Sequence, residues 1–105
     1  MENMTFTLDA PRAAAGNKQH VIVGVVASGD LEVLLERVQD TQRCEVSVAT
    51  PIRGFDTLWK YVIEDFVARR SAGGLRVSIN DGGARPDTVA LRLAQAVRLI
   101  EEDSN

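Results

Sequence analysis

An amphipathic helix between two alternating segments limits the folds open to this chain. From residue 55 to residue 67, large apolar side chains recur at the spacing of one helix face: Phe55, Leu58, Trp59, Val62, Ile63, Phe66 and Val67. On either side, segments 43–49 and 75–80 carry an apolar residue at every second position, which is typical of strands with one buried face. A strand, a helix and a strand in this order favour a right-handed crossover. We therefore expect the two strands to be parallel in one sheet.

Signals for helix ends, and for a second helix, extend this plan. Asp56 stands at the start of the first helix, where a carboxylate can cap free amides, and residues 69–70 followed by two glycines at 73–74 mark its end. After a break at residues 81–83, Pro86 opens a second helix. The apolar face of that helix consists of Val89, Leu93, Ala96, Val97 and Ile100.

The first part of the chain is predicted to supply further strands. Residues 4–8 alternate like a short strand, and residues 10–18 are predicted to form a mobile loop. Residues 20–27, dense in valine and isoleucine, suit a central strand. The spacing in 31–38 fits a strand or a short helix, and we favour a strand, joined to the next strand by a polar turn at 39–42.

Together these elements predict an α+β fold. We expect a two-layer sandwich in which a mixed sheet of four to five strands has two helices packed on one face. A chain of 105 residues is long enough for a single core, so residues 1–105 are predicted to form one domain, with disordered tails at 1–3 and 102–105.

Composition excludes several classes of function. The net charge of -3 offers no broad electrostatic attraction for nucleic acid. The longest apolar run, residues 21–27, is far shorter than the roughly 20 residues of a membrane helix, and the N-terminus lacks the pattern of a signal peptide, so we expect a cytoplasmic protein and no membrane partner. Cys44 is the one cysteine and His20 the one histidine, so we expect neither a disulfide nor a metal site.

The hydroxyl of Ser28 is the candidate functional group. Ala27 and Gly29 leave no bulky side chain beside it, and Asp30 adds negative charge suited to docking against a basic surface. A serine becomes a nucleophile when a base lies within reach, but His20 has no recognisable triad spacing, so we predict no catalytic residue. A serine can instead accept a group from a separate transferase. From the local sequence alone, however, Ser-Gly-Asp is more typical of an ordinary turn.

Other residues are weaker candidates. Arg53, in the loop before the first helix, could contact phosphate groups or a partner's carboxylate, although a solvated loop arginine is commoner. Phe55 and Trp59 are predicted to lie mainly in the core, with an exposed Trp edge available to a partner. The pair Gly82-Gly83 lacks the full spacing of a nucleotide-binding loop and indicates a turn.

Three segments together resemble a known family. They are 25–34, which contains Val-Val-Ala-Ser-Gly-Asp-Leu-Glu-Val-Leu, the tripeptide at 44–46, and Thr-Pro-Ile-Arg-Gly-Phe-Asp at 50–56 leading to Trp59. They resemble the delta subunit of malonate decarboxylase, the small acyl carrier protein of that complex, and the resemblance extends over residues 4–101. Fatty-acid and polyketide carrier proteins differ, because they are helical bundles with an Asp-Ser-Leu motif that is absent here.

The resemblance implies a prosthetic group and a set of partners. In this family a serine in the matching Ser-Gly-Asp segment carries 2'-(5''-phosphoribosyl)-3'-dephospho-coenzyme A through a phosphodiester, which implies Ser28 here, with Gly29 and Asp30 as neighbours in the attachment loop. The thiol of this arm would hold acetyl and then malonyl as thioesters during malonate decarboxylation to acetate. The implied role is a non-catalytic carrier subunit. Its implied partners are an acyltransferase (alpha) subunit, decarboxylase beta and gamma subunits, and a prosthetic-group transferase.

Two alternatives stay open. One is a small non-covalent interaction or regulatory module of the two-layer class, in which Ser28 is an unmodified turn residue. The other is the carrier subunit of citrate lyase, which bears a related arm. The continuation of the Ser28 segment through residues 29–36 and the segment 54–59 favour the malonate family.

Overall fold

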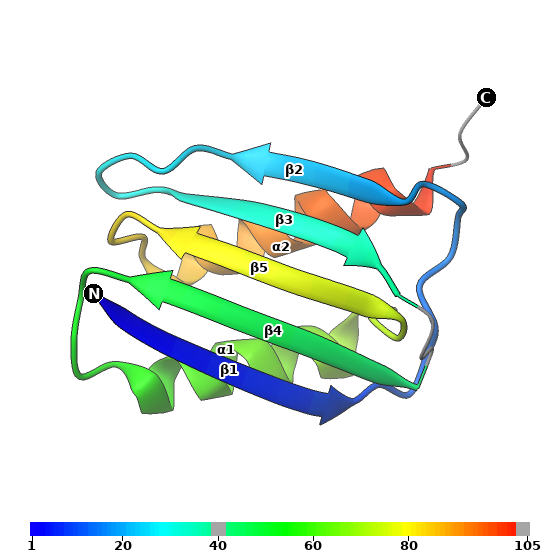
Figure 1. The fold of residues 1–105 in the computed structure, drawn as a ribbon, viewed down its shortest axis with the longest axis horizontal. Helices are drawn as coiled ribbons and strands as arrows, with labels where there is room; N and C mark the ends of the chain where they lie inside the picture. The colour runs from blue at the N-terminus through cyan, green and yellow to red at the C-terminus, as the bar shows by residue number, and fades with distance from the viewer. Residues whose placement is uncertain (39–41, 103–105) are drawn as a thin grey trace.

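The computed structural model describes residues 1–38 and 42–102, which form a sheet layer and a helix layer (Figure 1). Five strands make one sheet in the order β1-β4-β5-β3-β2, and both helices lie behind the same face of it. The elements are β1 (Glu2–Asp9), β2 (His20–Gly24), β3 (Leu31–Arg37), β4 (Arg43–Thr50), α1 (Asp56–Arg69), β5 (Leu75–Asp81) and α2 (Pro86–Glu101). The predicted α+β fold with a mixed sheet is confirmed.

The predicted crossover is present. β4 and β5 are parallel neighbours, with Val46 opposite Val77, and α1 connects them. β3 and β4 follow each other in the chain but are not partners, because β5 lies between them and pairs antiparallel with β3. Within the segment 31–38, residues 31–37 form a strand, as favoured over a helix. The turn predicted at 39–42 falls mostly on residues 39–41, which lie outside the described residues.

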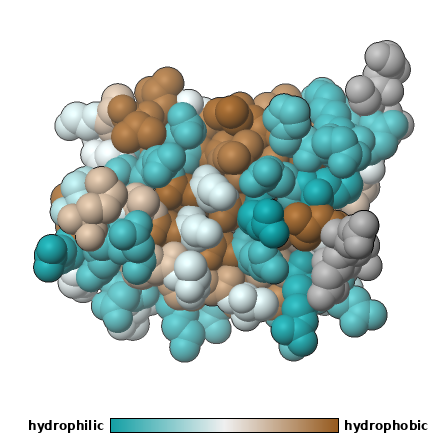
Figure 2. Space-filling view, viewed as in Figure 1, coloured by the Kyte–Doolittle hydropathy of each residue, from teal (hydrophilic) through white to brown (hydrophobic). Residues whose placement is uncertain are grey.

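The segment 20–27 is not a central strand, contrary to its composition. β2 ends at Gly24 and lies at the edge of the sheet, where it pairs with β3. Ile22, Val25 and Val26 are 59%, 58% and 57% exposed. Figure 2 shows apolar atoms gathered along this edge of the molecule. Valine and isoleucine favour a strand but do not determine its place in the sheet.

The other edge of the sheet also differs from expectation. β1 begins at Glu2, so residues 2 and 3, which the sequence assigns to a disordered tail, belong to the sheet. Its partner is β4, with Glu2 opposite Thr50. Of the tail expected at 102–105, residues 103–105 lie outside the described residues.

The core fills the space between the sheet and the two helices. Alternate residues of β3, β4 and β5 face it, including Leu31, Val46 and Ile79, and all five predicted core residues of α2 are buried. Trp59 is buried as predicted, but Phe55 is 48% exposed. The prediction that Phe55 is mainly core is therefore wrong: the residue lies just before α1, beyond the end of its buried face.

The loop between β1 and β2, predicted to be mobile, is fastened to the fold. The amide of Ala14 donates to the carbonyl of Gly73 at 2.9 Å. Arg37, at the end of β3, donates hydrogen bonds of 2.9 to 3.1 Å to four backbone carbonyl oxygens, those of Ala14, Ala15, Lys18 and Ile100. One guanidinium thus joins β3, this loop and the end of α2. Neither helix in the described part of the chain has the length and hydropathy to cross a bilayer.

Candidate functional site

Three loops emerge at one end of the sheet. They are residues 25–30 between β2 and β3, residues 82–85 between β5 and α2, and residues 51–55 between β4 and α1. The parallel strands β4 and β5 finish at this end, while β3, antiparallel to β5, begins there with Leu31 opposite Asp81. All three loops lie on the left in Figure 1. Candidate residues that are far apart in the chain therefore lie at the same end of the fold.

Ser28 is exposed on a tight turn. The carbonyl of Ala27 accepts a hydrogen bond from the amide of Asp30 at 3.0 Å, and Gly29 has a φ of 78°. A positive φ at the third position alone is the signature of a type II turn, so Ser28 holds the second position and Gly29 the position that glycine favours. The hydroxyl is presented to solvent between two small residues.

Gly82 stabilises this turn through two backbone hydrogen bonds. The amide of Gly29 donates to the carbonyl of Gly82 at 3.0 Å, and the amide of Gly82 donates to the carbonyl of Asp30 at 2.8 Å. A Cβ added at Gly82 would lie 2.1 Å from the carbonyl oxygen of Ala27. Only a residue without a side chain allows this approach. Residues 82 and 83 form a bend where the sequence indicates a turn, and their sequence does not reveal this contact with the Ser28 turn.

Asp30 is held by α2. Its carboxylate accepts two hydrogen bonds from the guanidinium of Arg92, at 3.1 Å to Oδ1 and 2.9 Å to Oδ2, and a third from the amide of Leu31 at 2.8 Å. The Arg92 hydrogen bond is the main cause that lowers the pKa of Asp30 below its ordinary value of 3.8. Because Arg92 neutralises this charge, Asp30 anchors the turn, and the structure does not support its predicted role as a docking charge.

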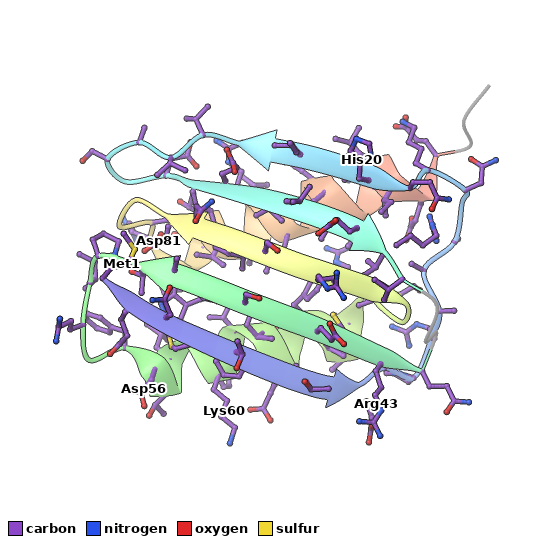
Figure 3. The ribbon with its side chains drawn as sticks, viewed as in Figure 1. Met1, His20, Arg43, Asp56, Lys60 and Asp81 are labelled. Atoms are coloured by element: carbon purple, nitrogen blue, oxygen red, sulfur yellow. The ribbon has the colours of Figure 1, made fainter. Side chains whose placement is uncertain are left out.

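The one histidine of the chain does not lie beside Ser28. His20 opens β2 opposite Glu36, at the far end of the strand from the Ser28 turn, and Figure 3 shows it well away from Asp81. Cys44 is buried in the core, and burial raises the pKa of its thiol to about 12. Among residues 1–38 and 42–102, no three His, Cys, Asp or Glu side chains are grouped to hold a metal ion.

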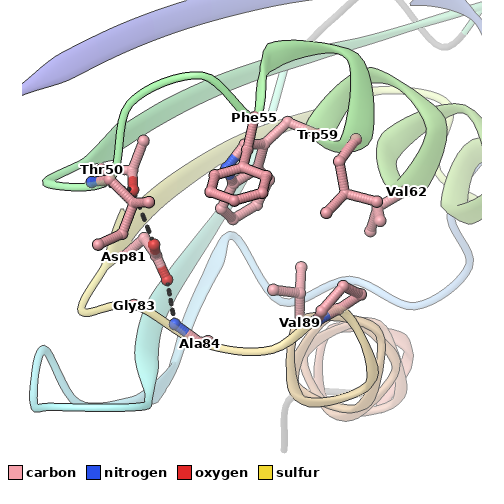
Figure 4. Close-up of a pocket in the computed structure, with 11 residues that line it drawn as sticks. Thr50, Phe55, Trp59, Val62, Asp81, Gly83, Ala84 and Val89 are labelled. Carbon is pink, nitrogen blue, oxygen red and sulfur yellow. Dashed lines mark hydrogen bonds between the residues drawn. The ribbon is translucent and has the colours of Figure 1, made fainter.

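An apolar pocket lies at this end of the fold, between α1 and α2 (Figure 4). Its volume is about 320 Å³, and apolar side chains make up most of its walls: Ile52, Phe55, Leu58, Trp59, Val62, Pro86 and Val89. At its base, the Thr50 hydroxyl donates to Asp81 Oδ2 at 2.8 Å, and the amide of Ala84 donates to Asp81 Oδ1 at 2.9 Å. Gly83 also lines the pocket, one residue from the Gly82 that supports Ser28.

Two arginines stand in the loops around this pocket. Arg53 is exposed between the pocket residues Ile52 and Phe55, so it lies at the same end of the fold as Ser28. Arg85 directly precedes α2, and its side chain is 84% exposed, with Asp87 at 3.6 Å. The sequence drew attention to Arg53 but not to Arg85, since an isolated arginine before a helix carries no local signal.

Comparisons with known proteins agree on one family. The family model of the malonate decarboxylase delta subunit matches residues 18–100. The malonate decarboxylase acyl carrier protein of Bradyrhizobium diazoefficiens is 54% identical, with 98% of each chain covered, and that of Xanthomonas euvesicatoria pv. vesicatoria is 45% identical, with 96% of each covered. A chain of the crystal structure of a Pseudomonas malonate decarboxylase hetero-tetramer in complex with malonate is 35% identical, with a TM-score of 0.83 over 95% of this chain and 99% of that one.

Proposed function

This chain belongs to the malonate decarboxylase delta subunit family, the acyl carrier proteins of that enzyme, and from this premise we propose that it carries acyl groups on an arm attached to Ser28. We propose that the arm is 2'-(5''-phosphoribosyl)-3'-dephospho-coenzyme A. When bound, its terminal thiol supplies the thioester chemistry that carries acetyl and malonyl groups. The protein's own part is to present the attachment oxygen and to hold it in place.

The residues around Ser28 fit such an attachment. A Cβ built on Gly29 meets no atom within 4 Å, so the space beside the hydroxyl is open to an incoming group. The backbone of Gly82 and the guanidinium of Arg92 fix the turn on both sides. With His20 at the far end of β2, Ser28 is suited to accept a group that another enzyme activates. This exposed and braced serine is the observation that carries the proposal.

We also propose the partners that such a role requires. They are a transferase that loads Ser28, an acyltransferase (alpha) subunit, and the decarboxylase beta and gamma subunits. The similarity to a chain of a hetero-tetramer supports assembly with other subunits. Val25 and Val26 lie within three residues of Ser28 and are more than half exposed, so an active site that accepts Ser28 must cover them. Their apolar side chains favour such burial.

Intact mass with peptide mapping tests the proposal. The chain is produced together with its loading transferase and partner subunits, and its mass is compared before and after mild base treatment. We expect the phosphoribosyl-dephospho-coenzyme A adduct on the Ser28 peptide, and no adduct in Ser28→Ala. Ser47→Ala is the matched control, because Ser47 is an exposed serine elsewhere on the sheet.

The stability of these variants should not change appreciably. Ser28 is exposed, so we expect Ser28→Ala to unfold within about 0.5 kcal/mol of the parent chain. An unmodified parent chain in the presence of active transferase, or a loaded Ser28→Ala chain, would refute the assignment. The first of these results would favour the interaction-module alternative.

A further inference from the structure

The apolar pocket adjoins the proposed attachment site through one short stretch of backbone. Gly82 forms two hydrogen bonds with the Ser28 turn, and its neighbour Gly83 lines the pocket. A Cβ built on Gly83 meets nothing within 4 Å, so open space extends along this loop. A group tethered to Ser28 would thus begin at the same end of the fold as the pocket, with the backbone of Gly82 and Gly83 between them.

The apolar walls of the pocket, which include the aromatic rings of Phe55 and Trp59, favour an uncharged group. Ile52, Phe55 and Leu58 are 43%, 48% and 40% exposed around it, which leaves apolar surface for a ligand to cover. Figure 4 shows Phe55, Trp59 and Val62 on one side and Val89 on the other. The volume of about 320 Å³ lies at the lower end of the roughly 300–1,000 Å³ of small-molecule sites, which suits part of a long arm and not the whole of it.

Charged residues at the base and rim of the pocket determine which part of the arm can enter it. Asp81, at the base, has its two carboxylate oxygens bound by Thr50 and by the amide of Ala84. An anionic group such as a phosphate or a malonyl carboxylate would be desolvated and repelled there. An amino group is favoured instead, since a carboxylate oxygen accepts more than one hydrogen bond. Arg53 and Arg85, in the loops at the rim, suit phosphates that remain outside.

We propose that this pocket binds the adenine base of the arm. The inference rests on the proposed function, because it requires that arm on Ser28. Adenine is flat and uncharged and carries an amino group. It also lies in the half of the arm nearest the attachment phosphate, whereas the thiol end must stay free to reach partner active sites. Tethering places the base at high local concentration, so a weak intrinsic affinity suffices. The pocket then fixes the first half of the arm and limits the volume that its thiol explores.

Trp59 provides the first readout. It is the one tryptophan in the chain and it lines the pocket, so its fluorescence and its indole N–H resonance report occupancy. We expect both signals to differ between loaded and apo chains. Ala84→Leu, which fills the pocket, should abolish the difference, and Phe55→Ala should reduce it. Leu91→Ala is the matched control, since Leu91 is an exposed apolar residue that does not line the pocket.

Isotope-filtered NMR identifies the occupant. With labelled protein and an unlabelled arm, we expect contacts between the adenine ring protons and the methyl groups of Val62 and Val89. Contacts from the pantetheine methyl groups instead would assign the pocket to the thiol half and overturn the adenine proposal. Loaded chains whose Trp59 signals and methyl resonances match those of the apo chain would also overturn it.

The two proposals fail separately. A mass spectrum that shows the adduct on Ser28, together with an unchanged pocket, refutes the adenine site and leaves the carrier role intact. Absence of the adduct refutes the carrier role. A titration of the apo chain with free AMP, in parallel with free pantetheine and up to the millimolar order reached by a tethered group, then tests the pocket without the arm. AMP should shift the Trp59 resonance and pantetheine should not, and the reverse would contradict the assignment.

Discussion

Replacement of Gly82 by alanine tests the packing that supports the Ser28 turn. The new Cβ would lie 2.1 Å from the carbonyl oxygen of Ala27 and 2.9 Å from that of Asp30, whereas ordinary contacts begin at 3.4 Å. Both obstacles are backbone atoms, so the turn must move by more than 1 Å, the difference between 3.4 and 2.1 Å. Such a shift breaks the two hydrogen bonds between Gly82 and the turn, now 3.0 and 2.8 Å long.

The expected loss of stability follows from these contacts. Two backbone hydrogen bonds at about 0.5–1.5 kcal/mol each amount to about 1–3 kcal/mol. The lower entropy of an unfolded chain with alanine in place of glycine offsets about 0.4–1 kcal/mol of this. We therefore expect Gly82→Ala to lower the free energy of unfolding by about 1–2 kcal/mol, which corresponds to a fall in Tm of roughly 5–15 °C.

Urea unfolding followed by Trp59 fluorescence measures this change, and amide NMR shifts locate it. Gly54→Ala is the control: Gly54 has a φ of 89°, but a Cβ added there would meet no atom within 4 Å, so alanine strains its own backbone without displacing the Ser28 turn. Only Gly82→Ala should shift the amides of Gly29 and Asp30. A Gly82→Ala chain that keeps both amide signals in place and unfolds within about 0.5 kcal/mol of the parent would show that Gly82 does not support the turn.

Three further predictions concern buried or paired groups. The pKa of Asp30 lies below 3.8 because Arg92 binds its carboxylate. Asp30→Asn should therefore lower the free energy of unfolding at neutral pH, and the loss should become smaller as the pH falls below 3.8. A difference between variant and parent in urea unfolding that stays constant from neutral pH into acid would contradict this. Burial raises the pKa of the Cys44 thiol to about 12, so iodoacetamide should label it only after unfolding, and rapid labelling of the native chain would count against this burial. Arg37→Ala should lower the free energy of unfolding by about 2–4 kcal/mol and speed amide exchange in the loop that it holds, while the exposed control Arg98→Ala should change stability by less than about 0.5 kcal/mol.

The elements of this fold were predictable because their signals are local. The face of α2 and the alternation of β4 and β5 follow from periodicity within a single segment, and the crossover follows from the order of those segments. The edge position of β2 was not predictable, since its valines and isoleucine show the preference for a strand and not which neighbours cover it.

In the candidate site too, local features were predictable and long-range contacts were not. The exposed turn at Ser28 could be predicted from a serine and a glycine in adjacent positions. The contacts of Asp30 with Arg92 and of Gly29 with Gly82 join residues more than 50 positions apart, and without related sequences no pattern in one chain reveals them. Phe55 continues the apolar pattern of α1, but it lies just before the helix begins. It is therefore half-exposed and lines the pocket.

The placement of the chain ends matters for anyone who handles this protein. Glu2 pairs with Thr50, a pocket residue, and Figure 3 shows Met1 at the same end of the molecule as Asp81. The last turn of α2 lies at the opposite end, where Arg37 binds the carbonyl of Ile100. A purification tag or a surface linkage joined to the N-terminus would therefore crowd the loops around Ser28. The same addition after α2 leaves them accessible to a visiting enzyme.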